Sequence, residues 1–80
     1  MKIEVLGPGC KNCESLERAT HEALSQLGMD VPVDKITDYG EIVAYGVMST
    51  PALAINGEVK TVGRVPSVGE ISELLTEGAS

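Results

Sequence analysis

A chain of 80 residues has room for one domain with one small hydrophobic core, and its 42% of apolar residues argues against general disorder. Its formal net charge is −6 and its six basic residues are scattered, which argues against binding to nucleic acid or to an anionic membrane. No apolar run approaches the ~20 residues of a membrane span, and Glu4 interrupts the stretch where a secretion signal needs its apolar core, so we expect a cytoplasmic monomer.

The first half of the chain predicts a strand, a helix and a second strand. Residues 2–6 form a short strand that ends at Gly7-Pro8-Gly9, because this turn continues neither a helix nor a strand. Residues 10–27 follow as a helix, since their apolar side chains recur at spacings of three and four. Residues 31–36 form the second strand, in which Pro32 lacks a backbone donor and indicates a sheet edge or the start of the strand.

The second half of the chain predicts a short helix, a hairpin and a final helix. A capping box that begins at Asp38 opens a helix over residues 38–45. Strands at 52–55 and 58–62 flank an Asn-Gly pair, the strongest two-residue signal for a hairpin. A second capping box opens the last helix, at residues 67–76.

This order, βαβαββα, predicts an α/β domain with a four-stranded mixed sheet flanked by three helices. A helix joins the first two strands, which makes them parallel, and the last two strands form an antiparallel hairpin. The first strand then lies inside the sheet, and the fourth lies at an edge, where Lys60 is a typical charged edge residue. This is a thioredoxin-like core. We expect one such domain at residues 1–76, a frayed tail at 77–80, and Met29 and Met48 in the core.

The two cysteines, Cys10 and Cys13, are separated by only two residues. As a structural link this pair would stabilise the fold little, because the entropic effect of a disulfide grows with the loop that it closes. Permanent disulfides are also rare in a reducing cytoplasm. The pair is therefore either redox-active or half of a metal site, and the number of cysteines does not decide between the two.

Two motifs carry a resemblance to a known family. The segment Gly9-Cys10-Lys11-Asn12-Cys13 follows the first strand, and Val47-Met48-Ser49-Thr50-Pro51 precedes the third, with the Thr-Pro pair beginning 37 residues after the second cysteine. Together with the hairpin and helix that follow, they resemble the thioredoxin-like small redox-active disulfide proteins (the redox-active disulfide protein 2 family). These are glutaredoxin-sized proteins with a thioredoxin fold, and the resemblance runs from Met1 to about Leu75.

The resemblance implies thiol–disulfide exchange with disulfide-containing protein substrates, and a thioredoxin-reductase-like protein as the electron donor. It also implies that Pro51 is a cis-proline beside the active site, where the Thr50 backbone could pair with an extended substrate. The alternative is a proline that simply begins the third strand. We assign Lys11 and Asn12 to the same substrate-binding surface; this pair differs from the Gly-Pro of ordinary thioredoxins and the Pro-Tyr of common glutaredoxins.

The spacing of the cysteines suits disulfide exchange, which needs an attacking thiolate and a second thiol close enough to release the mixed disulfide. At the start of the predicted helix, unpaired N–H groups and the helix dipole favour an anion, and Lys11 adds a positive charge. Cys10 is therefore the expected nucleophile. Cys13 lies one turn further on the same side of the helix, more buried, and is the expected resolving thiol.

Metal binding is the alternative function. Small heavy-metal-associated domains also carry a Cys-x-x-Cys after the first strand, but their βαββαβ order ends in a strand, whereas this chain is predicted to end in a helix. Two thiols also fill only half of a zinc site unless a second chain supplies the rest. We therefore favour a thiol–disulfide oxidoreductase, without cofactor or bound metal, over a metal-transfer module.

Glu4 is a candidate proton acceptor for Cys13. It lies in the strand that the predicted order places inside the sheet, where both faces are covered by helices. A buried carboxylate without a cationic partner binds a proton more readily than an exposed one, which suits general-base work near neutrality. Ordinary thioredoxins are similar in carrying a buried acid six residues before their first cysteine, as Glu4 does here. The alternative is that Glu4 reaches solvent or pairs with a lysine.

Overall fold

The computed structural model describes residues 1–79, and within them it contains the predicted elements in the predicted order. In chain order these are β1 (Ile3–Leu6), α1 (Lys11–Leu27), β2 (Val33–Ile36), α2 (Tyr39–Ala44), β3 (Ala52–Ile55), β4 (Glu58–Val62) and α3 (Val68–Ala79). The α/β fold class and the βαβαββα order are confirmed.

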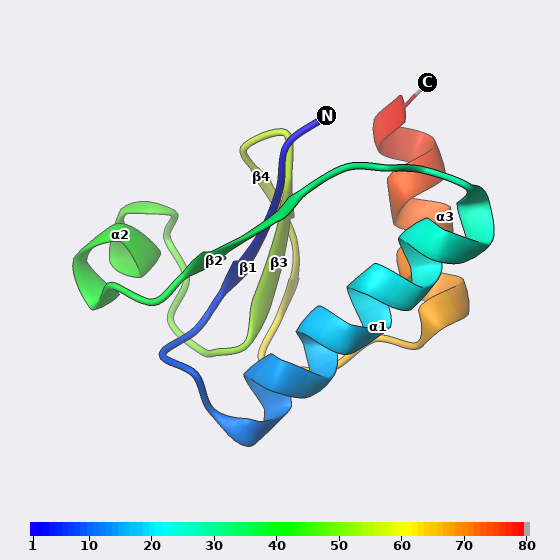
Figure 1. The fold of residues 1–80 in the computed structure, drawn as a ribbon. Helices are drawn as coiled ribbons and strands as arrows, with labels where there is room; N and C mark the ends of the chain where they lie inside the picture. The colour runs from blue at the N-terminus through cyan, green and yellow to red at the C-terminus, as the bar shows by residue number, and fades with distance from the viewer. Residues whose placement is uncertain (80) are drawn as a thin grey trace.

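The four strands form one mixed sheet in the order β2-β1-β3-β4. β1 pairs in parallel with β2 and antiparallel with β3, and β3 forms a hairpin with β4. Helices α1 and α3 lie together on one face of this sheet and α2 lies on the other (Figure 1). As predicted, β1 is an interior strand, and all four of its residues are buried.

The largest differences from the predicted boundaries are at the start of β2 and at the end of α3, and the other boundaries agree to within one residue. β2 begins at Val33 rather than at residue 31, because Pro32 has no N–H to donate to the neighbouring strand. α3 continues to Ala79, so the tail expected at 77–80 is helical as far as residue 79; Ser80 lies outside the described residues. Adding residues to a helix that already exists is much easier than starting one, which explains the extension.

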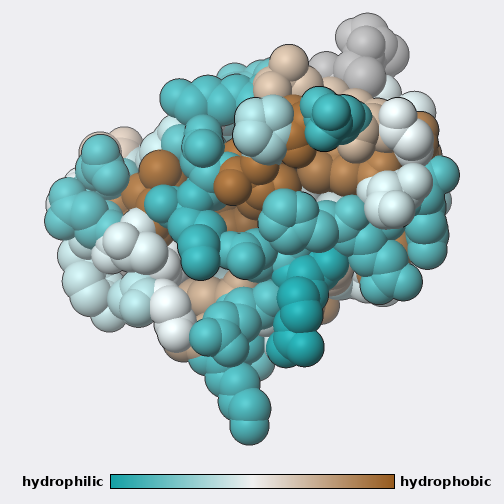
Figure 2. All heavy atoms as spheres, viewed as in Figure 1, coloured by the Kyte–Doolittle hydropathy of each residue, from teal (hydrophilic) through white to brown (hydrophobic). Residues whose placement is uncertain are grey.

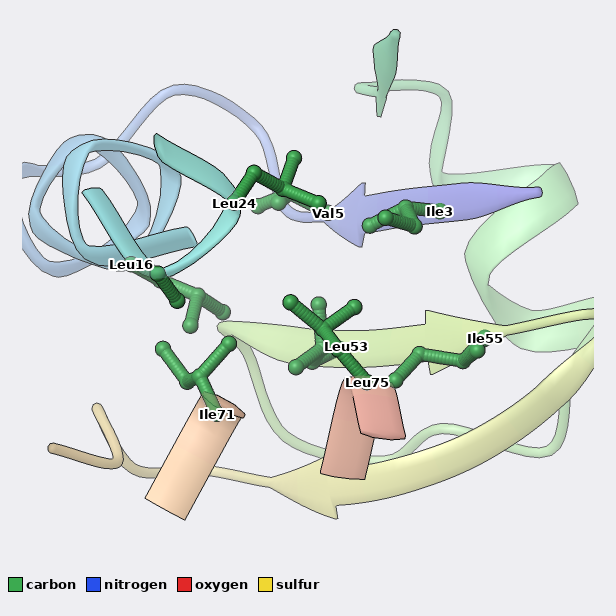
Figure 3. Packing of buried hydrophobic residues seen from close by; sticks show 9 residues of the cluster. Ile3, Val5, Leu16, Leu24, Leu53, Ile55, Ile71 and Leu75 are labelled. Carbon is green, nitrogen blue, oxygen red and sulfur yellow. The ribbon is translucent and has the colours of Figure 1, made fainter. Parts of the chain in front are cut away.

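The larger hydrophobic cluster fills the space between the sheet and helices α1 and α3. Figure 3 shows side chains from β1, β3 and both helices pointing into this shared space. Its members are Ile3, Val5, Leu16, Ala23, Leu24, Leu53, Ile55, Ile71 and Leu75, all buried. The core is filled by aliphatic side chains alone, because the chain has no Phe or Trp.

A smaller cluster lies on the opposite face, under α2, and includes Leu6, Ile42 and Ala54. Glu4 shares this face, because it stands directly opposite Ala54 in the β1–β3 ladder and paired residues of neighbouring strands point the same way. Its side chain is buried, and its carboxylate accepts a hydrogen bond from the Tyr45 hydroxyl. Lys2 Nζ lies 4.0 Å from the second carboxylate oxygen.

The surface divides between hydrophilic and apolar regions. In Figure 2 the outer side of α1 is mostly hydrophilic, whereas apolar atoms are exposed where the segment between α1 and β2 passes α3. Met29 and Val31, in that segment, pack against the larger cluster while remaining partly exposed, so the prediction that Met29 joins the core holds in part. Among residues 1–79, no helix has the length and apolar character needed to cross a membrane.

The larger cluster should account for much of the stability of so small a domain. We expect Leu53→Ala, in the fully buried centre of β3, to lower the free energy of unfolding by about 2–5 kcal/mol, because it removes apolar contacts and leaves a cavity. Leu27→Ala, at a side chain that is 40% exposed, is the matched control and should cost about 0.5 kcal/mol or less. Urea unfolding of the oxidised proteins, followed by circular dichroism, measures both; equal losses would contradict this assignment of the core.

The Glu4–Tyr45 contact should be visible in an alkaline titration. The hydrogen bond to Glu4, then partial burial, then the charges of Glu4 and Glu41 raise the pKa of Tyr45 above its ordinary value of 10.0. In a Tyr39→Phe background, which leaves one tyrosine to absorb, we expect phenolate formation above pH 10.0, and Glu4→Gln should move the pKa of Tyr45 down towards that value.

The same shift fixes the sign of its effect on stability. Since the folded protein holds this proton more tightly than the unfolded chain does, the stabilisation is complete below the ordinary value of 10.0 and declines as the pH rises through the folded-state pKa. A Tyr45 titration that Glu4→Gln leaves in place would show that the hydrogen bond does not form in solution.

Candidate active site

Cys10 and Cys13 form a disulfide at the N-terminal end of α1, with their Cα atoms 5.0 Å apart. Cys10 is the N-cap residue, in an extended backbone conformation, and its Sγ accepts a hydrogen bond from the backbone N–H of Cys13 at 3.2 Å. Cys10 is exposed, whereas Cys13 is only 5% exposed. The two sulfur atoms therefore differ in access to solvent, in the sense that the sequence predicts.

Gly7 lies against the buried cysteine. A Cβ atom added at this glycine would collide with Cys13 Sγ and would also come within 3.8 Å of Thr50 Cβ. Only a residue without a side chain therefore fits here without displacing Cys13. The contact also shows that Gly7, Cys13 and Thr50, which come from three separate parts of the chain, meet at one place.

The Thr50-Pro51 peptide bond is cis, as the family resemblance implies. Pro51 is fully buried and Thr50 is half-buried. The Pro51 carbonyl oxygen accepts a hydrogen bond from Gly63 N–H at 2.8 Å, which ties this loop to the end of β4. At Gly63 a Cβ would lie 3.2 Å from Ser49 Cβ, so the two segments pack closely. Proximity of Thr50 to the thiols is thus observed, while its part in substrate binding stays a prediction.

The residues around the disulfide are partly as expected. Lys11 and Asn12 are exposed in the first turn of α1, where they could touch a substrate. Met48, expected in the core, is 94% exposed, so this prediction was wrong. Its neighbour Val47 is buried at 4% and takes the inward position. Sequence reasoning missed Met48 as a surface residue, because both it and Val47 are apolar and only Val47 faces inward.

Glu4 is not brought to the thiols. Its side chain contacts Tyr45 and Lys2 on the α2 face of the sheet, whereas Cys13 lies with Val5 and Lys35 on the α1 face. The expectation that Glu4 is buried is confirmed. The alternative that it pairs with a lysine is confirmed in part, because Lys2 Nζ lies 4.0 Å from its carboxylate. Direct proton transfer from Cys13 to Glu4 has no contact to support it here and stays a prediction.

A small pocket of about 80 Å³ lies behind Cys13, between the first turns of α1 and the strands β1 and β2. Gly7 and Cys13 are among its lining residues, and Glu14, Glu17 and Lys35 contribute polar groups. Lys35 Nζ lies 3.4 Å from a carboxylate oxygen of Glu17. These charged residues belong to no motif in the sequence. The spacing of Cys13 and Glu17, four apart on a helix, was the signal that places them on one side.

The metal-binding alternative gains no support from the described residues. Among residues 1–79, no group of three or more His, Cys, Asp or Glu side chains is arranged to hold a metal ion. The chain order also differs from the βαββαβ order of heavy-metal-associated domains, since α3 follows the hairpin.

Comparisons with known proteins agree with this geometry. Residues 1–76 match the family described as "Thioredoxin domain". The chain is 42% identical over 76 residues to a thioredoxin of Methanothermobacter thermautotrophicus, which covers 95% of this chain and 99% of the relative. It is 36% identical over 73 residues to a thioredoxin of Methanocaldococcus jannaschii, covering 91% and 84%. A probable thioredoxin of Methanothermobacter marburgensis is 36% identical over 81 aligned positions, covering 96% and 94%.

The matches span almost all of the chain, and they fall on a protein with the expected strand order and the expected disulfide. The protein belongs to the thioredoxin family.

Proposed function

We propose that this protein reduces disulfide bonds in other proteins through the Cys10–Cys13 pair, and that a thioredoxin-reductase-like donor returns the pair to the dithiol. The observation that carries the proposal is the unequal placement of the two sulfur atoms. Cys10 is exposed at the N-terminus of α1 and Cys13 is buried one turn behind it. We expect this exchange to take place in the cytoplasm of the cell, with the protein acting as a monomer.

In the first step the Cys10 thiolate attacks a substrate disulfide. A bond forms between Cys10 Sγ and one substrate sulfur, the substrate S–S bond breaks, and the other substrate sulfur leaves as a thiolate. The N–H groups at the start of α1 support this role, since the Cys13 N–H already points at Cys10 Sγ. The exposed Lys11, next in the chain, adds a positive charge near the nucleophile.

In the second step Cys13 releases the substrate. Its thiolate attacks Cys10 Sγ, the intramolecular disulfide forms, and the mixed disulfide breaks to give the second substrate thiolate. Two electrons have then passed from the dithiol to the substrate. The Cα–Cα separation of 5.0 Å lies within the range for a disulfide, so the step needs no large backbone movement.

Substrate recognition is assigned to the exposed surface next to Cys10. Thr50, which meets Cys13 over Gly7, has a backbone that could pair with an extended substrate segment. Pro51 holds this loop in place through the hydrogen bond of its carbonyl group to Gly63. Lys11 and Asn12 border the same place on the helix side, and Met48 offers an exposed apolar side chain near it in sequence.

The two thiols of the reduced protein should differ strongly in reactivity. We expect Cys10 to react with iodoacetamide at least about tenfold faster than Cys13 near pH 7, because only Cys10 combines exposure with the helix N-terminus. Peptide mass spectrometry after brief labelling measures the ratio. Faster labelling of Cys13 would exchange the two assigned roles.

The single-cysteine variants test the whole exchange. Reduced Cys13→Ser should accumulate a mixed disulfide with a disulfide-containing substrate such as insulin, because the group that resolves it is missing. Cys10→Ser is the matched control and should trap little, since its remaining thiol is buried. Non-reducing gel electrophoresis with mass spectrometry reads the adducts. If both variants trap substrate equally, the assignment of nucleophile and resolving thiol fails.

A further inference from the structure

The second step of the exchange releases a proton that needs an acceptor. Cys13 attacks as a thiolate, yet it is only 5% exposed and packs against Gly7. Glu4, the buried carboxylate of β1, faces away on the α2 side of the sheet and accepts a hydrogen bond from Tyr45. The proton must therefore leave Cys13 on the α1 side, where the pocket of about 80 Å³ lies.

The charged groups that face Cys13 across this pocket come from two elements. α1 supplies Glu14, which is exposed, and Glu17, whose side chain is 26% exposed. β2 supplies Lys35, which stands opposite Val5 in the β1–β2 ladder and therefore points to the same face. β1 supplies Val5 and the turn after it supplies Gly7 and Gly9, none of which carries a charged side chain.

Glu17 is the better placed of the two carboxylates. It lies four residues after Cys13, one helical turn further along the same side of α1. Its ion pair with Lys35, at 3.4 Å, joins α1 to the edge strand β2 and holds the carboxylate beside the pocket. A pocket of this volume with polar groups in its wall has room for water, which needs only about 10–15 Å³ of accessible space.

We propose that Glu17, held by Lys35, accepts the Cys13 proton through water in this pocket during release of the substrate. The inference rests on the proposed function and names the proton route for its second step. The proton passes from Cys13 Sγ to pocket water while that water gives a proton to a Glu17 carboxylate oxygen. Glu17 then returns it to solvent, and the Cys13 thiolate attacks Cys10 as described above, so charge and atoms balance.

Proton acceptance by Glu17 and a purely electrostatic effect of its charge predict opposite changes in the rate of the second step. If Glu17 acted only through its negative charge, removing the charge would favour the Cys13 thiolate and speed the second step. If Glu17 accepts the proton, removing it slows the second step. The direction of the change therefore separates the two explanations.

A stopped-flow reaction with a symmetrical nitroaromatic disulfide measures the rates of the two steps separately. Attack by Cys10 releases one coloured thiolate, and attack by Cys13 on the mixed disulfide releases the second. We expect Glu17→Gln to leave the first phase unchanged and to slow the second about tenfold at pH 7, with recovery at high pH, where hydroxide removes the proton. Glu17→Asp, which keeps a carboxylate, should restore part of the rate.

Two further variants provide controls. Glu22→Gln makes the same charge change on an exposed part of α1 outside the pocket and should leave both phases as in the wild type. Glu4→Gln tests the carboxylate on the opposite face of the sheet, which is the other candidate acceptor.

The outcomes are distinct. A second phase in Glu17→Gln that is as fast as in the wild type, or faster, overturns the inference, and so does slowing by Glu4→Gln with Glu17→Gln normal. Equal slowing by Glu17→Gln and Glu22→Gln overturns it as well, because the effect would then be general to the helix. A wild-type protein that releases no second thiolate would overturn the proposed function itself, whatever the variants do.

Discussion

The close approach of Cys13 to Gly7 is the constraint on which the active site depends. β1 is an interior strand with both neighbours in place, so the position of Gly7 at its end is fixed by the sheet. The absent side chain there lets α1 begin close enough for the buried sulfur to lie over the backbone, with Thr50 at the same point. A glycine thus sets the distance between the thiol pair and the cis-proline loop, although it has no functional group of its own.

The alternation of side chains along β1 decides which acidic groups lie on the same face of the sheet as Cys13. The side chains of Ile3 and Val5 pack on the α1 side of the sheet, so Glu4, which lies between them in β1, faces α2. A shift of one residue in the register would exchange these faces. The sheet therefore separates Glu4 from Cys13 even though the two are close in sequence. The parallel pairing of β1 with β2 places Lys35 on the same face of the sheet as Cys13, and Lys35 forms an ion pair there with Glu17.

The sequence predicted those features that depend on local pattern. Gly7-Pro8-Gly9, the Asn-Gly turn and the periodic apolar residues were enough for the order of elements, and the order was enough for the interior position of β1. The cysteines and Pro51 carry their own motif. The face to which an individual side chain points was harder to predict from the sequence, because it depends on strand register and on how a helix crosses the sheet. This is why Met48 was placed inside the core, and why the pairing of Glu17 with Lys35 was not anticipated.

The two thiols occupy different electrostatic surroundings because α1 begins between them. Cys10 stands outside α1, where the N–H groups of the first turn point towards it, and solvent reaches it directly. Cys13 stands inside the helix, where its own N–H already donates to Cys10 Sγ and where it lines a pocket together with Glu14 and Glu17. A spacing of three residues is enough to cross from one environment to the other, since it spans most of a helical turn. The proposed exchange uses this difference, with attack by the outer sulfur before release by the inner one.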